Sequence, residues 1–456
     1  MHLRFIDLFA GLGGFHVGLS QLEMKCVFAS ELNKDLQELY KRNFGLEHVE
    51  GDIKKVDIET IPEHDLLCAG FPCQPFSKAG SQEGLKDEVR GNLFFNILAI
   101  LERHKPKYLL LENVANLRKH DEGETWKVIE AKLRGIGYDV KEKILSPHQF
   151  DVPQHRQRIF IVGILESEGG LENFNWPKPL LATRTIGDLL EDKPANERKI
   201  KNGEEKALHI WQEFINAIPD DVDLPSFPIW TTEYQATYPF EGQTPGLTSQ
   251  HELAKRKGMF GESLDGLSKE QQMQRIPTYA HPHKTHPHRL FPPWKQDFIR
   301  QNREFLKKYE KELADVMVKI RTLPFSWQKF EWNCKGWDRN IEELIIQFRP
   351  SGIRVKRPNY SPALVSFTRT QVPAIGWKWR YMTPREAARL QSLGDIELPS
   401  AETNAFRALG NAVNADVVAQ IAACLVGCPL PEPEQPTVVQ SHVPSAQRSL
   451  EFTATL

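Results

Sequence analysis

The chain has 456 residues, of which 40% are hydrophobic, and a formal net charge of -2. A chain of this length is too long for one ordinary core, so we expect two domains, or one large domain that carries an insertion. The near-zero net charge excludes a surface coated in positive charge, so any nucleic-acid binding has to come from a local basic patch.

The cysteine content and the hydropathy narrow the class of protein further. The six cysteines include no C-x-x-C pair, which argues against a disulfide framework or a zinc site, and we expect no metal ion. No apolar run approaches the roughly eighteen residues of a membrane span, and the N-terminus leads straight into an apolar stretch. We therefore expect a cytoplasmic protein without a targeting peptide and without a membrane partner.

Short apolar stretches alternate with helical stretches over the first 165 residues. Each apolar stretch is bounded by polar, Gly or Pro residues, as buried parallel strands tend to be. This alternation predicts an α/β fold with a doubly wound, Rossmann-like sheet. The expected strands are 4–9, 27–31, 66–70, 108–112 and 159–164, and the expected helices include 93–103 and 125–136.

A Gly-rich turn at residues 7–14, D-L-F-A-G-L-G-G, follows the first expected strand. Glycines there let the backbone turn tightly and let a ligand approach it closely. Glu31 ends the next strand, where it can accept hydrogen bonds from ribose hydroxyls, and Asp52 can receive the amino group of an adenine. A dinucleotide is disfavoured because His16 replaces the third glycine of G-x-G-x-x-G. The turn therefore favours an adenosyl cofactor.

A single cysteine, Cys73, follows the third expected strand, at the sheet edge where open α/β domains hold their sites. It lies in G-F-P-C-Q-P-F-S, where two prolines set the direction of the backbone. The polar, Gly-rich stretch 77–91 that follows is a candidate for a mobile lid. The alternative is that Cys73 is a small buried hydrophobic residue, as most lone cysteines are.

The pattern changes after about residue 180, where long irregular stretches replace the alternation. Residues 251–360 hold about 22 Lys and Arg against about 13 Asp and Glu, so this part of the surface can face phosphates. The best candidates for backbone contact, with a solvated loop as the alternative, are Arg349, Arg354, Lys356 and Arg357.

Regular structure returns near the C-terminus. The chain is helical again from Thr383, and the apolar helix expected at 412–425 can pack on the first domain. The tail from residue 429 is rich in Pro, Ser, Gln and Thr and is expected to be disordered.

Six motifs stand in one order along the chain, and together they resemble the motif set of the cytosine-5 DNA methyltransferases, above all the bacterial restriction-modification enzymes. The likeness covers residues 3–165 and 380–425. The motifs are F-A-G-L-G-G at 9–14, P-C-Q at 72–74, E-N-V at 112–114, Q-H-R-Q-R at 154–158, T-P-R-E-A-A-R-L-Q at 383–391 and G-N-A-V at 410–413.

The resemblance implies a domain order. A catalytic methyltransferase domain occupies residues 1–180 and is completed by a return segment at 376–428. A smaller, irregular target-recognition domain lies between them, at 181–375. The disordered tail is 429–456.

The resemblance also implies S-adenosylmethionine as the cofactor and a role for each motif. Cys73 is the nucleophile that adds to carbon 6 of cytosine, which makes carbon 5 reactive toward the sulfonium methyl group. Glu112 serves nitrogen 3 and the exocyclic amine of the base. Arg156 and Arg158 resemble the arginines that hold the base oxygen and support the cysteine and the glutamate. The implied cofactor residues are Phe9, Gly11, Leu12, Gly13, Glu31, Asp52, Ile53, Pro72, Leu93, Asn411 and Val413.

The implied partner is double-stranded DNA, from which the target cytosine is flipped into the pocket. Residues 74–90 are the expected clamp. The family's role is to protect bacterial DNA in the cytoplasm from a cognate restriction endonuclease, and we expect a monomer. Ala412 stands where the family usually has Ser, which removes one hydrogen bond to the cofactor.

Three other functions are open at this point. The same chemistry acts on transfer RNA in one branch of the family, although the long segment at 181–375 favours DNA. A DNA-binding relative without chemistry is disfavoured by the intact Cys73, Glu112, Arg156 and Arg158. A nicotinamide oxidoreductase is disfavoured by the missing third glycine.

Overall fold

The computed structural model describes residues 2–72, 93–283, 285–286, 288–364 and 371–430. Contacts divide the described chain into two compact units. The first comprises residues up to 196 together with 359–364 and 382–430, and the second comprises 197–358 and 371–381. The predicted domain boundaries at residues 181 and 376 stay predictions.

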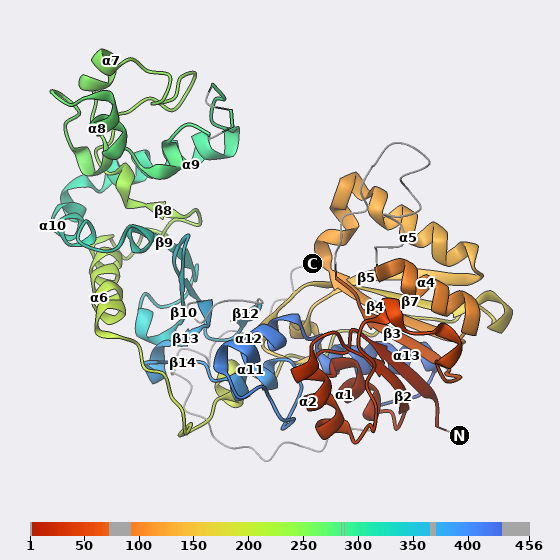
Figure 1. Ribbon diagram of the computed structural model, residues 1–456. Helices are drawn as coiled ribbons and strands as arrows, with labels where there is room; N and C mark the ends of the chain where they lie inside the picture. The colour runs from red at the N-terminus through yellow and green to blue at the C-terminus, as the bar shows by residue number, and fades with distance from the viewer. Residues whose placement is uncertain (1, 73–92, 284, 287, 365–370, 431–456) are drawn as a thin grey trace. The chain divides into compact units, whose positions relative to one another are not determined.

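The first unit is built on a six-stranded sheet with the order β2-β1-β3-β4-β7-β5 (Figure 1). The first four strands are parallel, and β7 runs antiparallel to both of its neighbours. The chain leaves β1 for β2 on one side and then crosses to β3 on the other, which makes the carboxyl ends of β1 and β3 a topological switch point. The strands are β1 (Arg4–Leu8), β2 (Lys25–Ser30), β3 (Leu66–Gly70), β4 (Tyr108–Val114), β5 (Tyr138–Leu145) and β7 (Arg158–Leu165).

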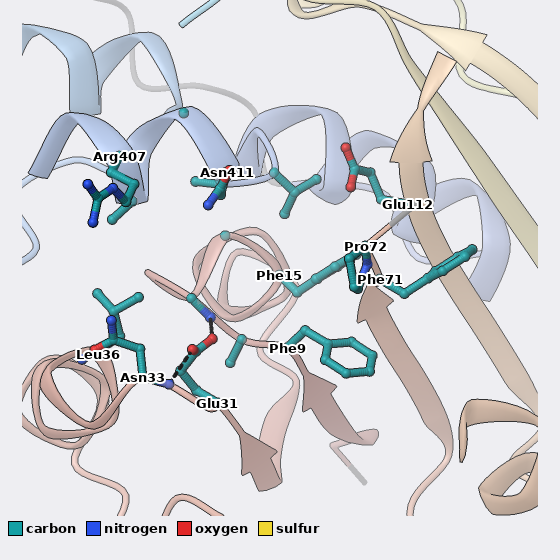
Figure 2. Close-up of a pocket in the computed structure, with 18 of the residues that line it drawn as sticks. Phe9, Phe15, Glu31, Asn33, Leu36, Phe71, Pro72, Glu112, Arg407 and Asn411 are labelled. Atoms are coloured by element: carbon teal, nitrogen blue, oxygen red, sulfur yellow. Dashed lines mark hydrogen bonds between the residues drawn. The ribbon is translucent and has the colours of Figure 1, made fainter. Parts of the chain in front are cut away.

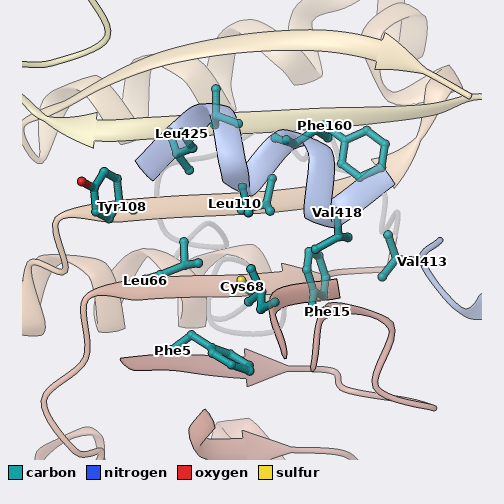
Figure 3. Close-up of a cluster of buried hydrophobic side chains, with 14 of the residues drawn as sticks. Phe5, Phe15, Leu66, Cys68, Tyr108, Leu110, Phe160, Val413, Val418 and Leu425 are labelled. Carbon is teal, nitrogen blue, oxygen red and sulfur yellow. The ribbon is translucent and has the colours of Figure 1, made fainter. Parts of the chain in front are cut away.

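Alternate residues of each strand enter two separate cores, one on each face of the sheet. Leu66 and Leu110 pack with α1 and α13 on one face, as Figure 3 shows. Leu67 and Leu109 pack with α4 and α5 on the other face. Because both faces are buried, the strands other than β5 are largely apolar, which is the pattern that predicted them. The helices are α1 (Gly14–Ser20), α2 (Lys34–Phe44), α4 (Leu93–His104), α5 (Glu124–Gly135), α11 (Pro384–Leu390), α12 (Glu402–Asn411) and α13 (Ala415–Val426).

The return segment packs on the first helix at very short range. A Cβ atom on Gly14 would lie 2.3 Å from the carbonyl oxygen of Val413, and one on Gly18 would lie 2.5 Å from that of Ala415. Glycine is therefore needed at both positions for α1 to approach the start of α13.

One expectation about hydropathy was wrong. The stretch Glu402–Val426 is long and apolar enough to cross a membrane, with 67% of its most apolar window buried inside the protein. The stretch is interrupted between Asn411 and Ala415, where Asn414 caps α13 by accepting a hydrogen bond from the backbone of Val417. Its apolar composition is explained by burial in the core of the first unit.

The second unit contains another six-stranded sheet, with the order β14-β13-β10-β11-β9-β8. Three of its strands have only two residues, so the sequence pattern there reads as irregular. Trp211 stacks on Phe330 with ring centroids 4.6 Å apart and attaches α6 to one face of this sheet. The strands are β8 (Ile229–Trp230), β9 (Lys329–Asn333), β10 (Ile345–Arg349), β11 (Gly352–Lys356), β13 (Ala374–Ile375) and β14 (Arg380–Tyr381), and the helices are α6 (Asn202–Ala217), α7 (Gln250–Ala254), α8 (Lys269–Gln274), α9 (Pro293–Lys308) and α10 (Glu310–Ile320).

Candidate functional site

A cavity of about 560 Å³ lies in the first unit, at the carboxyl ends of β1, β2, β3 and β4. Open α/β sheets bind ligands at this edge, in the crevice outside the switch point. Residues of the return segment form another wall of the cavity. The predicted site residues that line it are Phe9, Gly11, Glu31, Pro72, Glu112, Arg156, Arg158, Asn411 and Val413.

Glu31 is fixed in one part of the cavity by two backbone donors. Its carboxylate accepts hydrogen bonds from the N–H of Gly11, at 2.9 Å, and from the N–H of Asn33, at 2.8 Å (Figure 2). Gly11 has a positive φ of 54°, a conformation that favours glycine. A carboxylate held in this way keeps further lone pairs that can accept from the hydroxyls of a ligand.

The lining around Glu31 fits an adenosyl group. The rings of Phe9, Phe15 and Phe71 offer apolar faces to a base, and the carboxylate offers acceptors to a sugar. A Cβ atom on Gly11 would meet only the carbonyl oxygen of Phe9, at 3.9 Å, so the backbone there is open to a ligand. These apolar ring faces and carboxylate acceptors match the base and the sugar of a nucleoside cofactor.

A second carboxyl group, Glu112, lies in another part of the cavity and pairs with Arg158 at 3.0 Å. In the antiparallel register of β4 and β7, Val114 faces Arg158, which makes Glu112 and Arg158 diagonal neighbours. Burial raises the pKa of Glu112, and the charges of Arg158 and Arg156 only partly offset this. A raised pKa favours the neutral carboxyl group, which can donate a hydrogen bond.

Asn113 connects this pair to the end of β3. Its side-chain amide donates to the carbonyl oxygen of Phe71 at 2.9 Å, and its amide oxygen accepts from the N–H of Val114 at 2.8 Å. These bonds hold the backbone just before Pro72 and the predicted nucleophile. Cys73, the predicted clamp at 74–90 and the predicted lid at 77–91 lie outside the described residues.

Arg156 is buried, and its guanidinium donates to main-chain carbonyl groups. One Nη atom donates to the carbonyl oxygen of Leu364 and the other to those of Gly410, at 2.7 Å, and Ala412, at 3.1 Å. Burial and the neighbouring charge of Arg158 lower the pKa of Arg156. The carbonyls of Gly410 and Ala412 flank Asn411, so Arg156 holds the turn that carries Asn411 into the cavity.

Five predicted cofactor residues are not in the described lining of the cavity. Leu12 and Ile53 are buried in the core, and Gly13 packs against the ring of Phe44. Asp52 caps a short 3-10 helix by accepting from the N–H of Lys54. The fifth, Leu93, begins α4 and packs beside the core.

Several residues that line the cavity were not predicted from the sequence. Asn33 caps α2 and contributes to the wall beside Glu31, and Phe71 precedes Pro72. Asn404 and Arg407 of α12 also line the cavity. Both lie on the helix face of Asn411, seven and four residues before it, so helical periodicity is the signal that could have found them.

The fold and the cavity define a doubly wound α/β enzyme that binds a nucleoside cofactor beside a buried acid. Comparison with known families refines this class, because the family model of the C-5 cytosine-specific DNA methylases matches residues 3–426. The chain belongs to the C-5 cytosine-specific DNA methylase family. The predicted family, fold class and enzyme class are confirmed, and S-adenosylmethionine is the cofactor that the family implies.

Two type II methyltransferases match nearly the whole chain. The chain is 32% identical to the type II methyltransferase M.AluI of Cellulosimicrobium cellulans, over 91% of this chain and 90% of that protein. It is also 32% identical to M.BanI of Aneurinibacillus aneurinilyticus, over 92% of this chain and 95% of that protein. The match to M.DsaV of Dactylococcopsis salina is 49% identical but spans only 41% of this chain and about half of that relative, 53%.

A solved structure supports the fold alone. An E. coli prophage-encoded protein classed as a DNA modification methyltransferase superposes with a TM-score of 0.50 at 19% identity, over 93% of this chain and 99% of that one.

Proposed function

We propose that the chain is a type II DNA methyltransferase that transfers a methyl group from S-adenosylmethionine to carbon 5 of a cytosine in a specific double-stranded DNA site. The observation that carries this proposal is the buried Glu112 and Arg158 pair in the same cavity as the anchored Glu31. Family membership and the near full-length matches to M.AluI and M.BanI support it.

The chemistry at the base is assigned to Cys73 and Glu112. The Cys73 thiolate forms a bond to carbon 6 of the ring, and the neutral Glu112 donates its proton or a strong hydrogen bond to nitrogen 3 as the ring takes up electrons. S-adenosylmethionine, when bound, supplies the electrophilic methyl group. A water molecule then takes the carbon 5 proton, the thiolate leaves, and nitrogen 3 returns its proton to Glu112, which restores the aromatic ring.

The two arginines have different roles in this proposal. Arg158 lies beside Glu112 and is assigned to the base oxygen, while its charge restrains how far burial raises the pKa of Glu112. Arg156 donates to the carbonyls of Gly410 and Ala412, so we assign it as a positioning residue for the cofactor turn.

The cofactor is assigned to the part of the cavity around Glu31. Glu31 accepts from the sugar hydroxyls, Phe9 and Phe71 contact the base, and Asn411 bonds the amino-acid portion. The other predicted cofactor residues stay predictions; they are Leu12, Gly13, Asp52, Ile53 and Leu93.

DNA recognition is assigned to the second unit, in line with the predicted domain at 181–375. A target carbon inside a duplex is unreachable, so the cytosine is flipped into the cavity at a cost of a few kcal/mol. We propose that the protein acts as a monomer in the bacterial cytoplasm, without a membrane partner, and protects DNA from a cognate restriction endonuclease.

The test is covalent trapping. Wild-type protein is incubated with tritiated S-adenosylmethionine and duplex DNA in which 5-fluorocytosine blocks the final elimination. A labelled adduct on a denaturing gel is expected for wild type and for Cys424→Ser, a matched control at an exposed cysteine. No adduct is expected for Cys73→Ser. If wild type binds the cofactor but forms no adduct on any DNA sequence, the proposal is wrong.

A further inference from the structure

The second sheet carries a charged face that includes three of the basic residues expected to contact DNA, Arg349, Arg354 and Lys356. In the paired strands β9, β10 and β11, Glu331 lies beside Arg354, and Arg354 faces Gln347. Arg349 and Lys356 alternate with buried residues on the same strands and share this face. The opposite face is occupied by the core that α6 covers, where Phe330 stacks on Trp211.

Glu331 holds two arginines in fixed orientations on this face. One carboxylate oxygen accepts from an Nη atom of Arg349, and the other accepts from Nε of Arg354 at 2.6 Å. The side chain of Glu331 is only 16% exposed. Although burial opposes ionisation, the hydrogen bonds and charges of Arg354 and Arg349 lower the pKa of Glu331, which keeps it charged.

Positive charge remains after this pairing. Among the described residues, Arg349, Arg354 and Lys356 share the one carboxylate of Glu331. Burial, together with the proximity of the two arginines, lowers the pKa of Lys356. Half-buried cations that outnumber their carboxylate partners destabilise the folded protein, unless an anion or a set of hydrogen-bond acceptors binds them.

Arg354 supplies the geometry for such a partner. Its Nε is taken by Glu331, whereas its two Nη atoms have no hydrogen-bond partner in the described chain. Its side chain is 28% exposed, so a ligand can reach it. A guanidinium held at Nε presents its outer edge as a two-donor fork, which matches a pair of acceptors such as O6 and N7 of guanine or two phosphate oxygens.

We propose that Arg354, oriented by Glu331, makes a two-pronged contact with an acceptor pair on the DNA, the edge of a guanine or a phosphate group. This inference rests on the proposed function, because it assigns a reading residue to the target DNA. Glu331 is a positioning residue that sets the plane of the fork. A lysine cannot replace Arg354, since an ammonium group lacks the planar fork.

The experiment uses the full chain and a library of duplexes with random sequence. The library is methylated separately by wild type and by the variants Arg354→Gln, Arg354→Lys and Glu331→Gln. Sequencing after cytosine conversion then gives the base preference at every position around the methylated cytosine. Arg300→Gln is the matched control, because Arg300 of α9 is already paired with Glu241 and Asp297. Cofactor affinity and circular dichroism report on folding, and DNA binding is measured against salt concentration.

Contact with a guanine predicts that Arg354→Gln and Arg354→Lys lose preference for G at one position by about tenfold or more, with other positions unchanged. Contact with a phosphate predicts a uniform loss for Arg354→Gln, with a salt slope smaller by about 1. In either case Glu331→Gln removes a negative charge, so binding to non-specific DNA becomes stronger. At the same time the discrimination between bases or the rate of methylation falls.

A wild-type base profile and salt slope in Arg354→Gln would overturn the inference, and so would full activity in Arg354→Lys, which would show that charge alone suffices. If wild type methylates no cytosine in the library, the proposed function itself fails, and this inference fails with it. The two failures are therefore distinguishable.

Discussion

At the scale of single residues, the main feature of the site is a carboxyl group whose burial favours its neutral form. Glu112→Gln keeps the shape but cannot deliver a proton, so we expect the rate of methyl transfer to fall by a factor of about 10² to 10⁴. Single-turnover transfer to DNA measures this. Cofactor affinity should be unchanged, because Glu31 and not Glu112 is assigned to the cofactor, and a rate within twofold of wild type would remove Glu112 from the mechanism.

The burial of Glu112 also sets the direction in which the rate of methyl transfer changes with pH. The pKa of Glu112 is raised, so its neutral form persists above the pH at which an exposed glutamate ionises. Activity that needs the neutral form is present below the raised pKa and is lost as the pH rises through it. We expect the rate profile of wild type to have this alkaline limb and that of Glu112→Gln to lack it. A profile with the same limb in both proteins would assign the limb to another group.

The two arginines of the site are assigned different roles: Arg156 positions the turn that carries Asn411, and Arg158 contacts the base. Arg156→Lys loses at least two of the bonds to Leu364, Gly410 and Ala412, and charged hydrogen bonds contribute about 1.5–3 kcal/mol each. We expect S-adenosylmethionine to bind the DNA-free protein about tenfold or more weakly, as titration calorimetry can measure. Arg158→Lys should leave this affinity unchanged and lower the transfer rate instead. The reverse pattern would exchange the two assignments.

At the scale of elements, the contact between α1 and α13 joins the two ends of the chain within the first unit. Gly18→Ala puts a Cβ atom 2.5 Å from the carbonyl oxygen of Ala415, so the helices must separate. Overpacking of this kind costs about 1–3 kcal/mol of unfolding free energy, which exceeds the gain in helix propensity. Urea denaturation measures it, with Gly135→Ala as the control, since no atom lies within 4 Å of a Cβ there. Equal stabilities of the two variants would contradict the close packing.

The elements themselves were largely predictable from the sequence. Five strands of the first sheet were expected at or near their observed places because burial on both faces leaves short apolar runs. β5 (Tyr138–Leu145) was not expected, since its exposed and half-buried positions break the apolar run at one edge of the sheet. The second sheet was not predicted from the sequence, because half of its strands have only two residues and are too short for any period to show.

At the scale of the whole molecule, the first unit is assembled from segments that are distant in the sequence. Residues 382–430 supply α13 to the core and Asn411 to the cavity. A chain that ends at residue 381 should therefore expose the part of the sheet face that α13 covers, and should not bind S-adenosylmethionine. Calorimetry and circular dichroism test this. A chain that ends at residue 430 is the control and should bind the cofactor as the full chain does. Cofactor binding by the shorter chain would show that the return segment is dispensable.

The sequence by itself determined the local features of this protein. The four parallel strands of the first sheet, the Gly-rich turn, Glu31 just after β2 and Glu112 near the end of β4 all follow from periodicity and from the position of a residue in its element. These are short-range properties. The ordered motifs determined the family.

Only the tertiary structure decided which distant groups meet. Arg156 reads as one basic residue of the Q-H-R-Q-R motif, yet the carbonyl groups that its guanidinium contacts lie 208 to 256 residues away. Arg354 reads as one of several basic residues until the pairing of β9 with β11 places Glu331 beside it. Main-chain acceptors carry no side-chain signal, and strand pairing depends on packing across the whole unit, so neither contact is encoded in a local pattern.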